Sequence, residues 1–172
     1  MKLKVNRWFY GILAALLVTG VTAAFVFAQQ PDETTTLTAT VSKTGGIQGD
    51  AAALDLADFP DGVVVVNFMA GWCRPCWKEI PGFVEVYEDF KAQGLTMVGI
   101  SLQTPRDQTQ TMIDQLGITY PVYEDVTGQV ARDRFRLRSM PTTFVFKEGK
   151  EVERLEGEVT AQQLRDAVEA LL

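Results

Sequence analysis

Two cysteines, Cys73 and Cys76, are the only ones among the 172 residues, and they follow a run that predicts a buried strand. Residues 63–69 (VVVVNFM) are mostly β-branched, which is typical of a strand buried on both faces of a sheet. The next residues predict a helix from Cys73 to about residue 93, with Pro75 in its first turn, where a missing N–H is harmless. A CxxC pair between a strand and a helix is typical of a redox-active dithiol.

The position of each cysteine predicts its part in thiol–disulfide exchange. Cys73 at the amino end of the helix faces unsatisfied N–H groups and the positive end of the helix dipole, which favour a thiolate. Arg74 adds a cation beside it. Cys76 lies one turn further in, which suits a resolving thiol, and Pro75 stiffens the loop between the two sulfurs. We therefore expect Cys73 to attack a partner's disulfide and Cys76 to resolve the mixed disulfide.

The composition and net charge of the chain argue against several other kinds of functional site. The sequence has no histidine, which excludes Ser-His-Asp and Cys-His nucleophile pairs and imidazole-bound zinc. Zinc needs four ligands, which two cysteines do not supply, so we expect no metal. A purely structural disulfide stays an alternative, although closing a loop of about four residues would stabilise the fold weakly. The net charge of −6 and a pI near 4.7 argue against nucleic-acid binding.

The amino-terminal segment, residues 1–28, predicts a membrane anchor. Lys2, Lys4 and Arg7 precede an uncharged run over residues 8–28, which as a helix would span about 30 Å, the thickness of the bilayer's hydrocarbon core. The charges place the amino terminus in the cytoplasm and the rest of the chain outside, in a single pass. The alternative is a signal peptide cleaved after Ala28, which would leave a secreted or periplasmic protein.

The remaining sequence predicts a tether and one folded domain. Residues 29–50, rich in Thr and Gly, are interpreted as a flexible tether, and residues 51–172 as an α/β domain with a mixed sheet. Within it the pattern predicts a strand at 95–101, helices at 107–116 and 126–135, and a hairpin of strands 142–146 and 152–155. A last helix begins at an N-cap, Thr160.

Two motifs resemble a known superfamily. Residues 65–76 (VVNFMAGWCRPC) closely resemble the active-site strand and helix of the thioredoxin superfamily, and residues 139–143 (SMPTT) resemble its cis-proline loop. With the membrane segment and residues 77–81 (WKEIP), they are similar to the TlpA/ResA group of membrane-tethered thiol–disulfide oxidoreductases. The resemblance covers about residues 54–172 and implies a thioredoxin-like fold, a central mixed sheet flanked by helices.

The resemblance also implies roles for single residues. Pro141, after Met140, would have a cis peptide bond and shape the groove for the partner's chain. Glu79 matches an acid that this group keeps near its cysteines, and it lies three residues after Cys76, on the same helix face. In a chain without histidine, a carboxyl with a raised pKa would serve as proton shuttle for the resolving thiol. A solvated helix glutamate is the alternative.

Two further positions qualify the resemblance. Trp72 would shield the sulfur and contact partners, with simple packing as the alternative. Asn67 stands where thioredoxins themselves have a buried aspartate, which leaves more of the proton chemistry to Glu79. The group's activity implies client proteins with thiols or disulfides, such as apocytochrome c, and a membrane thiol carrier as electron donor. No cofactor is expected beyond the Cys73–Cys76 disulfide.

Several functions compete. The first is an extracytoplasmic oxidoreductase that reduces disulfides of exported proteins during cytochrome c maturation, held to the lipid bilayer by its amino-terminal helix. An oxidant that donates disulfides is the main alternative, and Arg74 favours it by stabilising reduced Cys73. A peroxidase, a copper-handling module and a non-enzymatic interaction protein are further alternatives. We expect a monomer.

Overall fold

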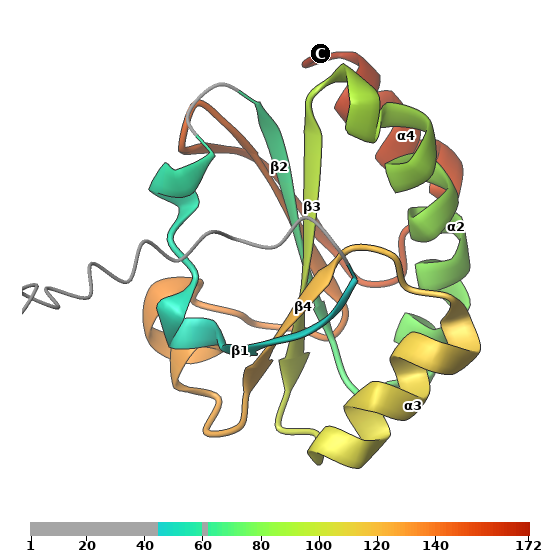
Figure 1. Cartoon of the computed structure of the whole chain (residues 1–172). Coiled ribbons are helices and arrows are strands. Elements are labelled where there is room, and N and C mark those ends of the chain that lie inside the picture. Colours follow the sequence, from blue (N-terminus) through green and yellow to red (C-terminus); the bar gives the residue numbers. More distant parts are fainter. Residues whose placement is uncertain (1–44, 60–61) are drawn as a thin grey trace, which may run out of the picture. The chain divides into compact units, whose positions relative to one another are not determined.

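A six-stranded mixed sheet lies at the centre of the computed structural model, which describes residues 45–59 and 62–172 (Figure 1). The strand order is β1-β4-β3-β2-β5-β6; the first four strands are parallel, β5 is antiparallel to β2, and β6 is antiparallel to β5. The strands are β1 (Gly46–Asp50), β2 (Val63–Met69), β3 (Leu95–Leu102), β4 (Pro121–Asp125), β5 (Thr142–Lys147) and β6 (Lys150–Glu156).

The helices α2, α3 and α4 cover one face of this sheet, and shorter turns cover the other (Figure 1). The alternation of side chains along β2 divides the core accordingly. Val65 and Met69 belong to the cluster under the helices, whereas Val66 and Phe68 belong to the cluster on the opposite face. The three helices are α2 (Arg74–Phe90), α3 (Arg106–Leu116) and α4 (Ala161–Glu169), and the turns are Ala51–Ala53, Leu56–Asp58 and the π-helical Val130–Arg134.

The sequence prediction of an α/β fold with a mixed sheet is confirmed. The buried strand over residues 63–69, the helix that begins after Cys73 and the carboxy-terminal hairpin all form. Thr160 caps α4 as predicted, in a capping box with Gln163. The long helix ends at Phe90, three residues earlier than predicted, and a 3-10 turn leads to Gly94, whose φ of 107° suits glycine.

The sheet edge formed by β1 and β4 differs from the prediction. Residues 46–50, assigned to the tether, form β1 and pair in parallel with β4. Main-chain pairing and the packing of Ile47 against the core define this strand, and the hydrophobic pattern does not reveal it. Strand β4 was not predicted because it ends in Glu124 and Asp125, although all five of its residues are buried. Its flanking helix is also shorter than predicted, a π-helical turn over Val130–Arg134.

The predicted anchor over residues 1–28 and most of the predicted tether lie outside the described residues. Within residues 45–59 and 62–172, no helix is both long and apolar enough to cross a bilayer.

Candidate active site

The two cysteines form a disulfide at the amino end of α2. Cys73 is the N-cap residue of the helix, and its Sγ accepts a hydrogen bond from the Cys76 backbone N–H at 3.3 Å. The Cα atoms are 5.4 Å apart. Cys73 is 4% exposed and Cys76 is fully buried. The outer sulfur is therefore the one that a partner can reach, and the inner one lies within the core, as the sequence predicts.

The loop before the helix is held at both polar atoms of Gly71. Its backbone N–H donates to Thr104 Oγ1 at 3.0 Å, and its carbonyl accepts from the Trp77 indole Nε1 at 3.0 Å. A Cβ at this position would lie 3.0 Å from Thr104 Cγ2, so glycine allows the close approach. Thr104 in turn donates to the Leu102 carbonyl. These contacts fix the direction in which the loop presents Cys73.

Strand pairing places the second predicted loop next to the first. Phe68, one residue before the end of β2, pairs with Thr142, the first residue of β5. The Met140–Pro141 loop therefore lies beside the loop that leads from β2 to Cys73. The Met140–Pro141 peptide bond is cis, as the resemblance implied, and Met140 packs against the cluster that contains both cysteines.

The surface around the disulfide combines an aromatic ring and a cation. Trp72 is 58% exposed, an unusual state for a large aromatic side chain. Arg74 is exposed and has no ion-pair partner within residues 45–59 and 62–172, and Pro75 is half-buried. An exposed tryptophan beside a reactive sulfur offers contact area to an incoming chain.

Glu79 is buried below the disulfide, one helical turn after Cys76. It is 4% exposed, so the alternative of a solvated helix glutamate is wrong. Its Oε1 accepts from Asn67 Nδ2 on β2 at 3.0 Å, and its Oε2 accepts from the Val159 backbone N–H, just before α4, also at 3.0 Å. The same Asn67 Nδ2 donates to Thr143 Oγ1 on β5 at 3.0 Å. The carboxyl thus joins α2, β2 and the segment between β6 and α4.

Burial raises the pKa of Glu79 to about 7. Loss of hydration is the largest cause, and the two hydrogen bonds from Val159 and Asn67 oppose it, while the nearby charge of Glu158 adds to the increase. A carboxyl that titrates near neutral pH can accept and return a proton under physiological conditions.

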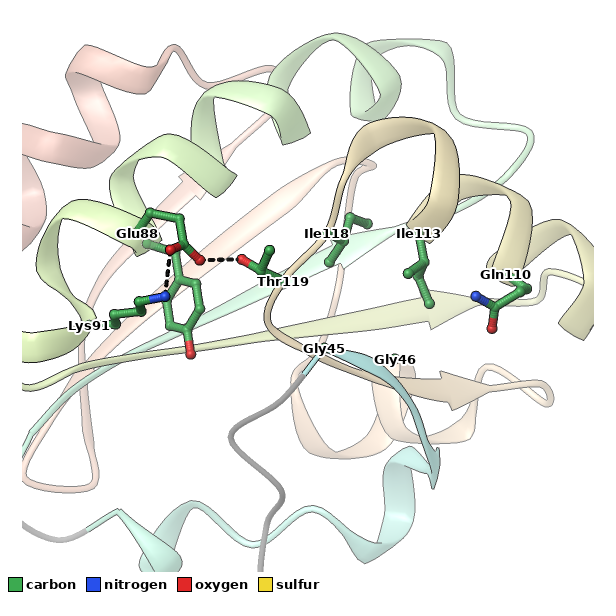
Figure 2. A pocket seen from close by; sticks show the side chains of 9 residues that line it. Gly45, Gly46, Glu88, Lys91, Gln110, Ile113, Ile118 and Thr119 are labelled. Atoms are coloured by element: carbon green, nitrogen blue, oxygen red, sulfur yellow. Dashed lines mark hydrogen bonds and ion pairs between the residues drawn. The ribbon is translucent and has the colours of Figure 1, made fainter.

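The pocket drawn in Figure 2 lies at the other end of α2. Glu88 accepts from Thr119 Oγ1 at 2.6 Å and pairs with Lys91, while Gly45 and Ile118 line the opening. Glu88 follows Cys73 by fifteen residues along the helix, which corresponds to about 20 Å. This pocket is therefore separate from the disulfide. No group of three or more candidate metal-binding side chains comes together within residues 45–59 and 62–172.

The chain is similar to known proteins in both sequence and fold. Residues 32–155 match the AhpC/TSA family. The chain belongs to the AhpC/TSA family. The thiol-disulfide oxidoreductase ResA of Oceanobacillus iheyensis is 33% identical over 116 residues, which cover 67% of this chain and 60% of that protein. The chain thus spans about three fifths of the length of this relative.

Two solved structures are similar to this chain in fold. A thiol:disulfide interchange protein of the thioredoxin family from Chlorobium tepidum has a TM-score of 0.61 and 26% identity, covering 67% of this chain and 83% of that one. A secreted thiol-disulfide isomerase from Corynebacterium glutamicum has a TM-score of 0.64 and 28% identity, covering 69% and 75%. The predicted thioredoxin-like fold is confirmed.

In this AhpC/TSA-family chain, most of the predicted site residues lie close together, and further groups that sequence did not predict support them. The structure brings Trp72, Arg74, both cysteines and Glu79 to one end of α2, with the Met140–Pro141 loop beside them. Three supporting groups were not predicted: Thr104, the Trp77 indole and the Val159 N–H. Trp77 follows the CxxC motif directly, so its position offered a signal, whereas Val159 acts through its backbone and offers none.

Proposed function

We propose that the chain is an extracytoplasmic thiol–disulfide oxidoreductase that reduces disulfides of exported client proteins, apocytochrome c among them. The observation that carries the proposal is the position of the Cys73–Cys76 disulfide, at the amino end of α2 and beside the Met140–Pro141 loop. The name of the Oceanobacillus iheyensis relative, thiol-disulfide oxidoreductase, supports the reaction class.

The reaction starts from the reduced pair. The Cys73 thiolate attacks one sulfur of a client disulfide; the client S–S bond breaks, and its other sulfur leaves as a thiolate. Cys76 then loses its proton and attacks Cys73 Sγ. The bond between Cys73 and the client breaks, and the client's second sulfur leaves. The client gains two electrons, the enzyme becomes the disulfide seen here, and a membrane thiol carrier returns two electrons to it.

Glu79 accepts the proton that Cys76 releases. The two residues share one face of α2, three positions apart, which corresponds to about 5–6 Å between Cβ atoms. With a pKa near 7, the carboxyl is partly ionised at neutral pH and available as a base. The exposed Trp72 and the Met140–Pro141 loop receive the client chain beside the reacting sulfur.

The amino-terminal segment places the domain outside the cytoplasm in this proposal. The uncharged run over residues 8–28 anchors the domain to the outer face of the membrane, or is removed after Ala28. The word "secreted" in the name of the Corynebacterium glutamicum neighbour is consistent with action outside the cytoplasm.

A disulfide donor is the second candidate, because exposed Arg74 and the helix amino end both stabilise a reduced Cys73. The reduction potential separates the two functions. The full chain is equilibrated in thiol buffers, and free thiols are counted by alkylation, with Cys73→Ser as the control that cannot form the disulfide. A value near −270 mV supports the reductant, and a value near −120 mV refutes it in favour of the donor.

A further inference from the structure

The side-chain amide of Asn67 is only half satisfied in the core. Its Nδ2 uses both protons, one toward Glu79 Oε1 and one toward Thr143 Oγ1, each at 3.0 Å. Its Oδ1 is fully buried and has no hydrogen-bond partner within the described part of the chain. A buried amide oxygen without a donor is costly, and nothing on that side locks the amide in one orientation.

The contacts of Glu79 determine which oxygen carries its proton. Oε2 accepts from the backbone N–H of Val159, a group that can only donate. Oε2 therefore stays an acceptor whether or not the carboxyl is protonated. Because the carbonyl oxygen of an acid is a better acceptor than its hydroxyl oxygen, the Val159 bond favours the proton on Oε1, which faces the Asn67 amide.

When protonated Oε1 directs its hydrogen toward Asn67, the amide orientation seen here no longer fits, because Nδ2–H and Oε1–H point at each other. We propose that Asn67 is a positioning residue whose amide turns over with the proton of Glu79, offering N–H to the carboxylate and Oδ1 to the acid. This inference rests on the proposed function of Glu79 as the proton acceptor for Cys76.

Both orientations keep the same number of hydrogen bonds. With Glu79 ionised, Nδ2 donates to Oε1 and to Thr143 Oγ1. With Glu79 protonated, Oε1–H and the Thr143 hydroxyl both donate to Oδ1, because a hydroxyl can act as donor or acceptor. Leucine could make none of these bonds, and aspartate would add a second carboxyl that competes for the same proton. Asparagine serves both states.

Besides the hydrogen bonds, one nearby charge affects the pKa of Glu79. Glu158, before α4, repels the carboxylate, and Lys78 pairs with Glu158 on the surface at 3.5 Å. Tyr120, just before β4, is also buried. Desolvation, and to a lesser degree the charge of Glu79, raises the pKa of its phenol, so the phenol stays neutral. Thr143 lies two residues after Pro141, on the strand β5 that follows the Met140–Pro141 loop. The Asn67 amide therefore links the protonation state of Glu79 to a hydrogen bond on that strand.

The test follows the amide by NMR in the full chain in detergent micelles. The Asn67 side-chain N–H signals are assigned by their loss in Asn67→Leu, and the Glu79 carboxyl carbon by its loss in Glu79→Gln. We expect the cross-peak from the Asn67 amide protons to Thr143 to be strong at pH 8.5 and to lose most of its intensity at pH 5.5. The loss should share its midpoint with the Glu79 carboxyl. Glu79→Gln imitates the protonated acid, so in this variant the cross-peak from the Asn67 amide protons to Thr143 should be weak at every pH.

Asn67→Leu provides a second readout. Loss of the amide should raise the Glu79 midpoint by about one pH unit, because the hydrogen bond that Asn67 gives to the charged carboxylate is stronger than the one it accepts from the neutral acid. Ser101→Ala is the matched control: it removes a buried hydrogen bond on the neighbouring strand, between Ser101 and Thr109, and should leave the midpoint unchanged.

Two outcomes overturn the inference: a cross-peak that stays constant while Glu79 titrates, or a carboxyl that does not titrate between pH 5 and 9. Neither measurement depends on disulfide exchange. A chain that shows the switch but fails to reduce disulfides would therefore contradict the proposed function alone.

Discussion

Replacing Glu79 by glutamine should stabilise the protein at neutral and alkaline pH, even though it removes the proposed proton acceptor. The wild-type carboxyl is buried, and among residues 45–59 and 62–172 two groups, Asn67 and Val159, donate hydrogen bonds to its ionised form. Glutamine keeps an acceptor for the Val159 N–H, and once the Asn67 amide turns over it presents a donor to the otherwise unpartnered Oδ1. The uncharged side chain therefore fits the same space without the cost of dehydrating a charge.

The size of the effect follows from the pKa of Glu79. Folding raises this pKa from 4.5 to about 7, so the folded state binds the proton more tightly than the unfolded state. Between these two pH values the folded carboxyl is protonated and the unfolded one is not, and the free energy of unfolding falls as pH rises. A shift of this size corresponds to about 3 kcal/mol, present below pH 4.5 and fully lost above pH 7.

This contribution of Glu79 to the free energy of unfolding can be measured by urea unfolding at several values between pH 4.5 and pH 8. The oxidised full chain is compared with Glu79→Gln. The stability of the variant minus that of the wild type should grow by about 3 kcal/mol across the range. The lowered pKa of Glu88, caused first by its hydrogen bond to Lys91, acts below pH 4.5 and is shared by both proteins. A difference that stays constant with pH would refute the reasoning, because Glu79 would then titrate alike in both states.

Three other substitutions test separate parts of the structure. Cys76→Ser should trap a mixed disulfide between Cys73 and a client, seen as a band on a non-reducing gel that reductant removes; a chain that forms no such band would contradict the order of attack. Tyr120→Phe should raise the free energy of unfolding by about 1 kcal/mol, because the buried Tyr120 hydroxyl has no partner within the described residues, and a loss of stability would reveal one. Thr160→Ala should lower it by about 1 kcal/mol, measured by urea unfolding, because it removes the capping box with Gln163; an unchanged midpoint would mean that packing alone fixes α4.

The parts of the site that sequence could predict are those encoded within a few consecutive residues. The strand, the CxxC turn and the start of α2 occupy residues 63–76, and each has its own local pattern. The Met140–Pro141 loop was found because its motif is short and continuous. Glu79 was singled out by the resemblance, and its spacing from Cys76 placed it on the correct helix face.

The remaining parts depend on contacts between distant residues. Val159 is 80 positions from Glu79 and contributes only its backbone N–H, which every residue other than proline has. Thr104 supports Gly71 across 33 positions, and a threonine at a strand end has no pattern that reveals its partner. Strand β1 is defined by main-chain pairing at the sheet edge, where side-chain alternation is weak.

One helix supplies both of the environments that this chemistry needs. At its amino end, Cys73 caps unsatisfied N–H groups, which favour a charged thiolate. Two turns further along, Glu79 lies in the dehydrated interior, where its neutral form is favoured and its pKa rises to about 7. In the proposed reaction, these opposite environments separate the nucleophile Cys73 from the proton acceptor Glu79. The chain has no histidine, so in the proposed reaction a carboxyl whose pKa is raised by burial on α2 takes the place of an imidazole.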